Sequence, residues 1–222
     1  MSSTRPARPL EVRHLQLARA IIAAIAAAMI TFSPDHSAPM GLSVFSGFAI
    51  TTAFVMFVSA WLVFPAGLRA PVILLGAIDV IAGMVAGIGQ IRTDTLFFAL
   101  VITWAAATGL VELVSGLRGR RAEKGTAARA EARDALTVGI LGLALAAGLL
   151  LVPAGYALNY TVAEAHQTFT LTGITIGVGV FGGYAAIVAV FLGIAGFSPR
   201  PQPVSEAAAA TAASDDDTGG AA

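Results

Sequence analysis

Six long apolar segments limit what this chain of 222 residues can fold into more than any other feature. Each is long enough for an α-helix to cross a bilayer, which takes about 20 residues. Only 12% of the residues are charged, roughly half the share of an ordinary soluble domain. The sequence therefore predicts an all-α bundle of six transmembrane helices, built from three consecutive helical hairpins in a membrane domain at residues 15–198. The predicted spans are about 15–32, 41–64, 71–90, 95–117, 135–152 and 169–197.

Three polar stretches flank or interrupt these spans. They are a basic N-terminus at 1–14, a basic loop at 118–134 and an acidic tail at 201–222 that is rich in Ala, Ser and Asp. The composition of the tail is typical of disordered segments. We expect no signal-peptide cleavage after Ala38, because His36 occupies a position that needs a small residue. The first apolar segment is therefore predicted to be a span.

The positively charged residues indicate the orientation of the bundle. Of the 13 Lys and Arg residues, only Arg92 falls on the side of the predicted topology opposite the chain termini. Positive residues concentrate in the cytoplasmic loops of membrane proteins. The sequence therefore predicts that both termini are cytoplasmic, in the inner membrane of a bacterium, because the overall composition looks bacterial.

Two acidic residues, Asp79 and Glu112, fall inside predicted spans, and each lies between two glycines on one helix face. Buried acids are costly in hydrocarbon, so each is a candidate functional residue. If the two spans form a hairpin, the carboxyl groups lie at similar depth and compete for one proton, which would make a site for proton or ion handling. The flanking glycines are expected to allow close helix approach: Gly76, Gly83, Gly109 and Gly116.

A structural role for the two acids is the main alternative. Glu112 could form an ion pair with Arg69 or Arg118, and Arg19 could pair with Asp79. Either ion pair would only fix the packing of the helices. Catalysis is the weakest alternative, because the sequence shows no nucleophile–base pair and no phosphate-binding glycine loop, so no catalytic residue is assigned.

The remaining candidates are weaker. His36 and His166, in predicted outward loops, could sense pH, although solvated surface histidines are the simpler interpretation. The chain has no Cys and three His residues far apart in sequence, so we expect no metal site and no cofactor. The last span carries glycines at small-residue spacings, which predict helix packing. They are Gly173, Gly177, Gly179 and Gly183.

Two segments resemble a known family. The glycine-rich segment 139–153 ends in Pro153, and the segment 104–118 carries Trp104, then Gly109 and Glu112, and a basic end. They are similar to the spans of the HdeD-like family of small bacterial multi-span membrane proteins. The resemblance covers about residues 15–198 and implies an association with acid resistance at the inner membrane. It implies no established chemistry and no catalytic residues.

The predicted function is that of a non-enzymatic inner-membrane protein of envelope or acid-stress physiology. One alternative is a small proton-coupled transporter or channel that uses Asp79 and Glu112. A second is an accessory subunit of a larger membrane complex, docked through the basic loop. The expected partners are the lipid bilayer and either further copies of the chain or another membrane protein. A formal net charge of zero argues against nucleic acid.

Overall fold

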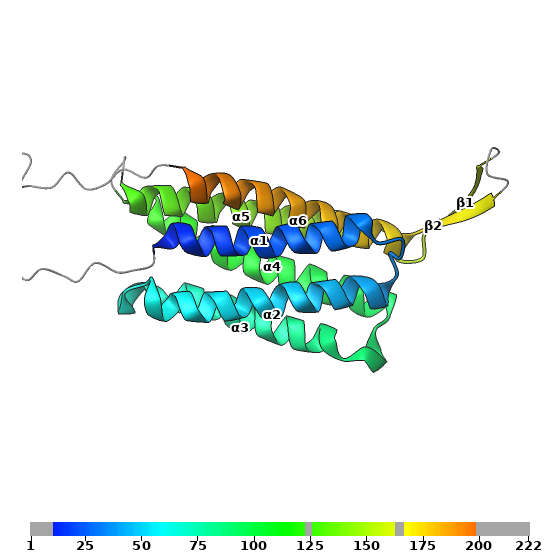
Figure 1. Ribbon diagram of the computed structural model, residues 1–222, viewed down its shortest axis with the longest axis horizontal. Helices are drawn as coiled ribbons and strands as arrows, with labels where there is room; N and C mark the ends of the chain where they lie inside the picture. The colour runs from blue at the N-terminus through cyan, green and yellow to red at the C-terminus, as the bar shows by residue number, and fades with distance from the viewer. Residues whose placement is uncertain (1–10, 123–125, 163–166, 199–222) are drawn as a thin grey trace, which may run out of the picture.

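Six long helices run side by side along one axis in the computed structural model, which describes residues 11–122, 126–162 and 167–198 (Figure 1). The helices are α1 (Val12–Phe32), α2 (Ala38–Leu62), α3 (Arg69–Gly87), α4 (Asp94–Gly119), α5 (Ala127–Leu150) and α6 (Gly173–Phe197). Each is long and apolar enough to cross a membrane. The six predicted helices are therefore confirmed, and the chain is compatible with a multi-pass membrane protein.

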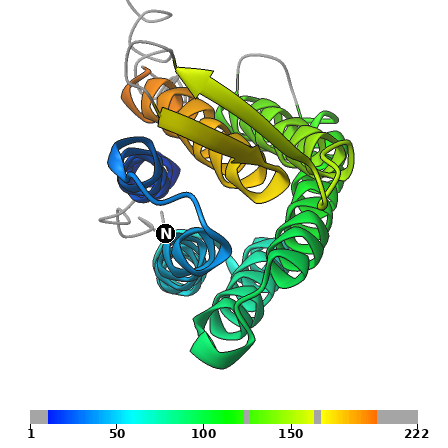
Figure 2. The same cartoon turned by 90° about the vertical axis from the view of Figure 1, so that its right-hand side faces the viewer.

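The helices form a ring in sequence order that closes where α1 meets α6 (Figure 2). Within this ring the most extensive packing joins α2 with α3, α4 with α5, and α6 with α1. The predicted hairpins instead paired the first span with the second, the third with the fourth and the fifth with the sixth. Those consecutive helices are neighbours too, but they pack less closely.

Glycines explain why α4 and α5 pack so closely. A Cβ atom added at Gly109 would lie 2.9 Å from the backbone oxygen of Gly139, and one at Gly139 would lie 2.6 Å from the backbone nitrogen of Leu113. Gly116 meets the backbone oxygen of Ala132 at 2.7 Å in the same way. Only glycine leaves room for two helix backbones at this distance.

The other predicted packing glycines divide into two groups. Four lie against a neighbouring part of the chain: Gly76, Gly83, Gly173 and Gly177. In contrast, a Cβ atom at Gly179 or Gly183 would meet nothing within 4 Å. These two glycines therefore do not pack within the chain. A further glycine of α6 that was not predicted to pack, Gly182, lies against Ile30 of α1.

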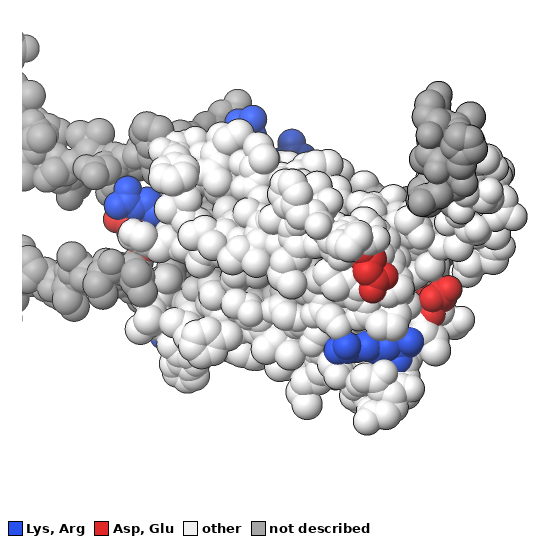
Figure 3. Space-filling model, turned by 45° about the vertical axis from the view of Figure 1, so that its right-hand side comes forward, with Lys and Arg blue, Asp and Glu red and all other residues white. Residues whose placement is uncertain are grey.

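The outward surface of the ring is apolar. Figure 3 shows that the face in view carries few charged side chains, and that these gather toward the two ends of the helices. Each helix exposes large apolar side chains, for example Ile25, Phe54, Ile81, Leu110, Ile140 and Ile187. Such a surface suits lipid better than water.

The two ends of the ring differ in charge. The helices α1, α3 and α5 begin, and α6 ends, at one end, which we call the basic end (Figure 1). The arginines at that end are Arg13, Arg69, Arg118, Arg120, Arg121, Arg129 and Arg133. Among the residues that the structure describes, the opposite end carries only Arg92.

The structure corrects two predicted boundaries, and a third predicted segment lies outside the described residues. Residues 157–172, predicted as a loop and the start of the last span, form an antiparallel hairpin of β1 (Ala157–Val162) and β2 (Gln167–Thr172). This hairpin extends beyond the opposite end of the ring (Figure 1). The predicted basic loop at 118–134 is largely helical, because α4 continues to Gly119 and α5 begins at Ala127. The predicted disordered tail at 201–222 lies outside the described residues.

Candidate functional site

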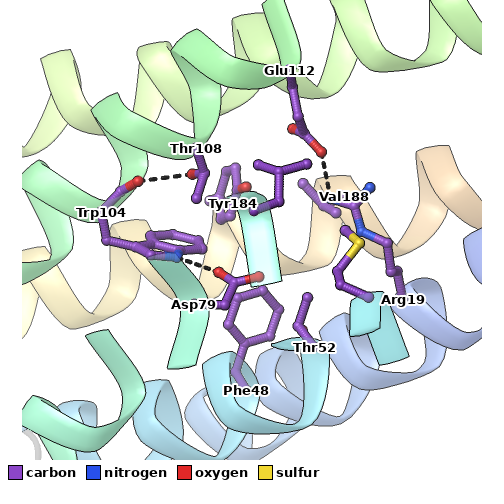
Figure 4. Close-up of a pocket in the computed structure, with 11 residues that line it drawn as sticks. Arg19, Phe48, Thr52, Asp79, Trp104, Thr108, Glu112, Tyr184 and Val188 are labelled. Carbon is purple, nitrogen blue, oxygen red and sulfur yellow. Dashed lines mark hydrogen bonds and ion pairs between the residues drawn. The ribbon is translucent and has the colours of Figure 1, made fainter. Parts of the chain in front are cut away.

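A small cavity lies inside the ring, and residues from five of the six helices line it (Figure 4). Its volume, counted for the centre of a water-sized sphere, is about 20 Å³, which is room for about one water molecule. The polar residues in its wall come from α1, α2, α3, α4 and α6. They are Arg19, Thr52, Asp79, Thr108, Glu112 and Tyr184.

Asp79 is the most deeply buried acid at this cavity, with 3% of its surface exposed. The indole Nε1–H of Trp104 donates a hydrogen bond to its Oδ1 at 2.6 Å. The rings of Phe45 and Phe48 pack edge to face against Trp104, with centroids 5.1 and 5.7 Å away, and hold the indole in place. Within the described part of the chain, Asp79 forms no ion pair. A neutral donor is therefore its hydrogen-bond partner.

Glu112 has a charged partner. The Nη2 of Arg19 donates to its Oε1 at 2.7 Å, and the two side chains are 19% and 7% exposed. Arg19 lies about 10 Å from the start of α1 and Glu112 about 10 Å from the end of α4, at 1.5 Å per residue. Both ends belong to the basic end, so the two groups meet at equal depth. Since α1 and α4 are not neighbours in the ring, this ion pair crosses its interior.

Two threonines at the cavity differ in their hydrogen bonds. Thr108 donates to the backbone oxygen of Trp104 at 2.8 Å. The hydroxyl of Thr52 is buried and has no partner among the described residues. A buried polar group without a hydrogen bond costs about 1–3 kcal/mol, so a molecule in the cavity that bonded to Thr52 would remove this cost.

A second polar contact lies between the cavity and the basic end. Gln16 lies about one helical turn before Arg19 in α1, and its Nε2 donates to Oδ2 of Asp134 at 2.6 Å. Gln16 is 5% exposed, and Asp134 of α5 is partly exposed. Polar side chains therefore follow one another from the basic end to the cavity.

The predicted pairing of the charged residues needs correction. The structure brings Asp79 and Glu112 to one cavity, but Arg19 pairs with Glu112 instead of Asp79. Arg69 donates to the backbone oxygen of Phe64 and stacks over Trp61, whose ring centroid is 5.0 Å from its Cζ. Arg118 is exposed in the last turn of α4. Neither arginine lines the cavity.

The prediction that His36 and His166 sense pH stays a prediction, because His166 lies outside the described residues. Asp35, next to His36, accepts hydrogen bonds from the backbone N–H and the hydroxyl of Ser37 at 2.8 and 3.0 Å. The backbone hydrogen bond, more than any other contact, holds the pKa of Asp35 below its usual value. Asp35 is therefore engaged in the turn before α2. No group of three His, Cys, Asp or Glu residues able to hold a metal ion occurs where the structure describes the chain.

Several residues of the site escaped the sequence analysis. Trp104 was noticed only for its family resemblance, and Thr52, Tyr184 and Gln16 were not singled out. Threonine, tyrosine and tryptophan are common in apolar spans, so the presence of these residue types does not indicate a functional site. A polar Gln16 about one turn before Arg19 on the same helix was the one pattern that could have extended the site.

Comparison with protein-family models, with curated proteins and with solved structures finds no match for this chain. The resemblance to the HdeD-like family stays a prediction, because no comparison tests it. Functional inference therefore rests on the geometry of the cavity and of the ring.

Proposed function

We propose that this chain is a multi-pass membrane protein that binds and releases protons at the cavity, acting as a small proton-coupled transporter. The main support for this proposal is the charge of the residues that line the cavity. Two buried carboxyl groups, those of Asp79 and Glu112, share one guanidinium group, that of Arg19. With all three groups ionised, one negative charge is left over, and one proton neutralises it. An unbalanced charge inside a membrane protein is costly, so the proton state of this cavity has a large effect on the energy of the bundle.

The hydrogen bonds support Asp79 as the residue that carries the proton. The Glu112 carboxylate receives a hydrogen bond from a guanidinium group at 2.7 Å, which stabilises its charge directly. Asp79 has the neutral indole of Trp104 instead. The remaining negative charge therefore belongs to Asp79, which is the group that a proton would neutralise.

The finer features of the proposal rest on the sequence. The excess of arginine at the basic end supports an orientation with both chain termini in the cytoplasm, in the inner membrane of a bacterium. The resemblance to the HdeD-like family supports a non-enzymatic role in envelope or acid-stress physiology. A protein that moves protons through Asp79 would fit that role.

Proton flux into liposomes tests the proposal. The purified protein is reconstituted with a pH-sensitive dye inside the vesicles, and an acid jump is applied outside. We expect Asp79→Asn to reduce the protein-dependent flux by about 100-fold, within the range by which positioned proton-transfer groups act. Asp94→Asn is the matched control, because Asp94 is exposed in the first turn of α4.

Three results would overturn the proposal. One is that the wild-type proton flux never exceeds the flux of protein-free liposomes, whichever solute is added and whichever direction the pH gradient has. A second is a flux through Asp79→Asn equal to that of the wild type. Equal losses in Asp79→Asn and Asp94→Asn would mean that the flux does not depend on the cavity, and would overturn it as well.

One observation favours a second candidate, a purely structural role. The Arg19–Glu112 ion pair joins two helices that are not neighbours, so it can act as a brace across the ring. A braced bundle without flux would suit an accessory subunit of a membrane complex. The liposome experiment separates the two candidates, because a brace predicts no Asp79-dependent flux.

A further inference from the structure

We infer that, in the conformation that the structure describes, Asp79 exchanges its proton with the basic end of the ring only, through one water molecule held by Thr52 in the cavity, so that release to the opposite end needs a second conformation. This inference rests on the proposed proton binding at Asp79 and adds its route and direction. Three independent features carry it. They are the unpartnered Thr52 hydroxyl, the polar contacts toward the basic end and the closed packing toward the opposite end.

The water site follows from Thr52 and the size of the cavity. Thr52 is 5% exposed, its hydroxyl has no partner in the described chain, and it shares the cavity wall with Asp79. A buried water molecule typically makes about three hydrogen bonds to polar groups that lack partners. The cavity volume of about 20 Å³ accommodates about one such molecule.

The route continues toward the basic end. In Figure 4 the Arg19–Glu112 pair and Trp104 lie on different sides of the Asp79 carboxyl group. Beyond that ion pair, about one turn nearer the basic end, come Gln16 and its partner Asp134. Asp134 is partly exposed, so the series of polar groups ends where water can reach it.

Aromatic rings close the side toward the opposite end. The four rings of Phe45, Phe48, Trp104 and Phe181 pack edge to face with centroids 5.1 to 5.8 Å apart. Beyond them, Phe97 has no exposed surface and lies about 5 Å along α4 from its first residue. These rings and Phe97 form an apolar layer between Asp79 and the opposite end.

The contact between α2 and α3 closes the same side beside Asp79. Gly83 lies one turn further along α3, and a Cβ atom there would lie 2.6 Å from Cγ1 of Ile50. The hydroxyl of Ser46 donates to the backbone oxygen of Gly83 at 2.7 Å and fastens the two helices together. This contact therefore packs α2 tightly against α3 beside Asp79.

The proton balance of the route is simple. A proton that arrives from the basic end bonds to the water oxygen, and a second O–H bond of that water breaks as its proton moves to Asp79. The water is left neutral, and Asp79 gains one proton. The charged or titratable groups that share the cavity with Asp79 are Arg19 from α1, Glu112 from α4 and Tyr184 from α6, while the sequence of α2 contains no titratable residue.

The direction of proton exchange is tested in two preparations of membrane vesicles. In one preparation every C-terminus faces outward, and in the other every C-terminus faces inward. The carboxyl infrared band of Asp79, identified by its loss in Asp79→Asn, is followed while the outside pH changes and the inside pH is buffered. A C-terminal tag reports which end faces out, because α6 ends at the basic end (Figure 1). We expect the band to follow the outside pH at once only in vesicles whose C-terminus is outside, because in the other vesicles the exchange waits for the change of conformation.

The outcomes separate the route from the proposed function. A band that follows the outside pH equally fast in vesicles of both orientations overturns the one-sided route but leaves proton binding intact. A band that never changes with pH from either side overturns proton binding at Asp79 and the route with it.

The rate of the same signal after a rapid pH change tests the water. We expect Thr52→Val, which keeps the shape but removes the hydroxyl, to slow the response by about tenfold or more, and Thr52→Ser to keep it near the wild-type rate. Thr51→Val is the matched control, because Thr51 is exposed on the same helix. An unchanged rate in Thr52→Val would overturn the water at Thr52.

Discussion

Single residues at the cavity divide into those that balance charge and those that do not. Arg19 and Glu112 neutralise one another across the interior of the ring. Asp79 adds a further carboxyl group with a neutral partner. The two acids look alike in sequence, each between two glycines, yet their surroundings give them different roles. Glu112 stabilises the fold through its ion pair, whereas Asp79 is the residue whose charge changes when it binds a proton.

Removing one member of the ion pair tests this division. We expect Glu112→Gln to destabilise the protein by about 3 kcal/mol, because the largely buried Arg19 guanidinium loses the carboxylate that accepts its hydrogen bond. Replacing both residues by methionine should restore most of the loss, since apolar pairs often substitute for buried ion pairs. Thermal unfolding in detergent measures both effects. Equal stability of Glu112→Gln and the wild type would show that the Arg19–Glu112 pair does not contribute to the free energy of unfolding.

The residues of the site could be predicted only in part. Asp79, Glu112 and Arg19 are charged residues within apolar sequence. The free-energy cost of placing such residues in a membrane is enough to mark them as candidate site residues. Their pairing could not be predicted, because it depends on which helices face one another across the ring. Thr52 could not be singled out either, since its missing hydrogen bond is visible only once the surrounding side chains are placed.

Among the elements, α4 and α5 make the closest helix pair, and glycine makes it possible. We expect Gly139→Ala to destabilise the protein by about 1–3 kcal/mol, because its Cβ atom would lie 2.6 Å from the backbone nitrogen of Leu113. Gly148→Ala in the same helix is the control, since the nearest atom would be 3.9 Å away. We expect it to be neutral or slightly stabilising, as removing a helical glycine favours the helix.

The thermal unfolding midpoints of the two alanine variants decide this point. A loss at Gly139 with none at Gly148 supports close backbone packing between α4 and α5. Equal effects at both positions would mean that helix propensity alone, and not the approach of the two backbones, governs the response.

The element boundaries show where sequence patterns were sufficient and where they failed. The six helices follow from apolar length, which depends little on neighbours. The β-hairpin was missed, although residues 158–162 and 168–172 alternate apolar and polar residues as strands do. The predicted span absorbed its second strand because Phe169 and Leu171 are apolar. The hydroxyl of Thr172, which accepts from the N–H of Thr175, marks the true start of α6.

The whole molecule has one strongly basic end, and this predicts how it sits in the membrane. The chain has no Cys, so single cysteines can be introduced without removing others. We expect Gly67→Cys, near the basic end, to react with an impermeant thiol reagent only from the cytoplasm, and Gly89→Cys only from outside. Both glycines have open space around their Cα atoms, so the replacements fit. Labelling of both positions from the same side would contradict a six-span topology.

The ion pair across the ring also constrains the order of events during synthesis. Glu112 follows Arg19 by 93 residues, a delay of about 5 to 20 s at bacterial and eukaryotic translation rates. Throughout that interval α1 enters the bilayer with an arginine and without its partner, and the side chain reaches back about 10 Å to the headgroups. Its final position, and the contact of α1 with α6, are available only after the ribosome has delivered the later helices. We therefore expect the nascent first helix to stay near the headgroups on the side of the basic end until the later helices bring Glu112 to Arg19.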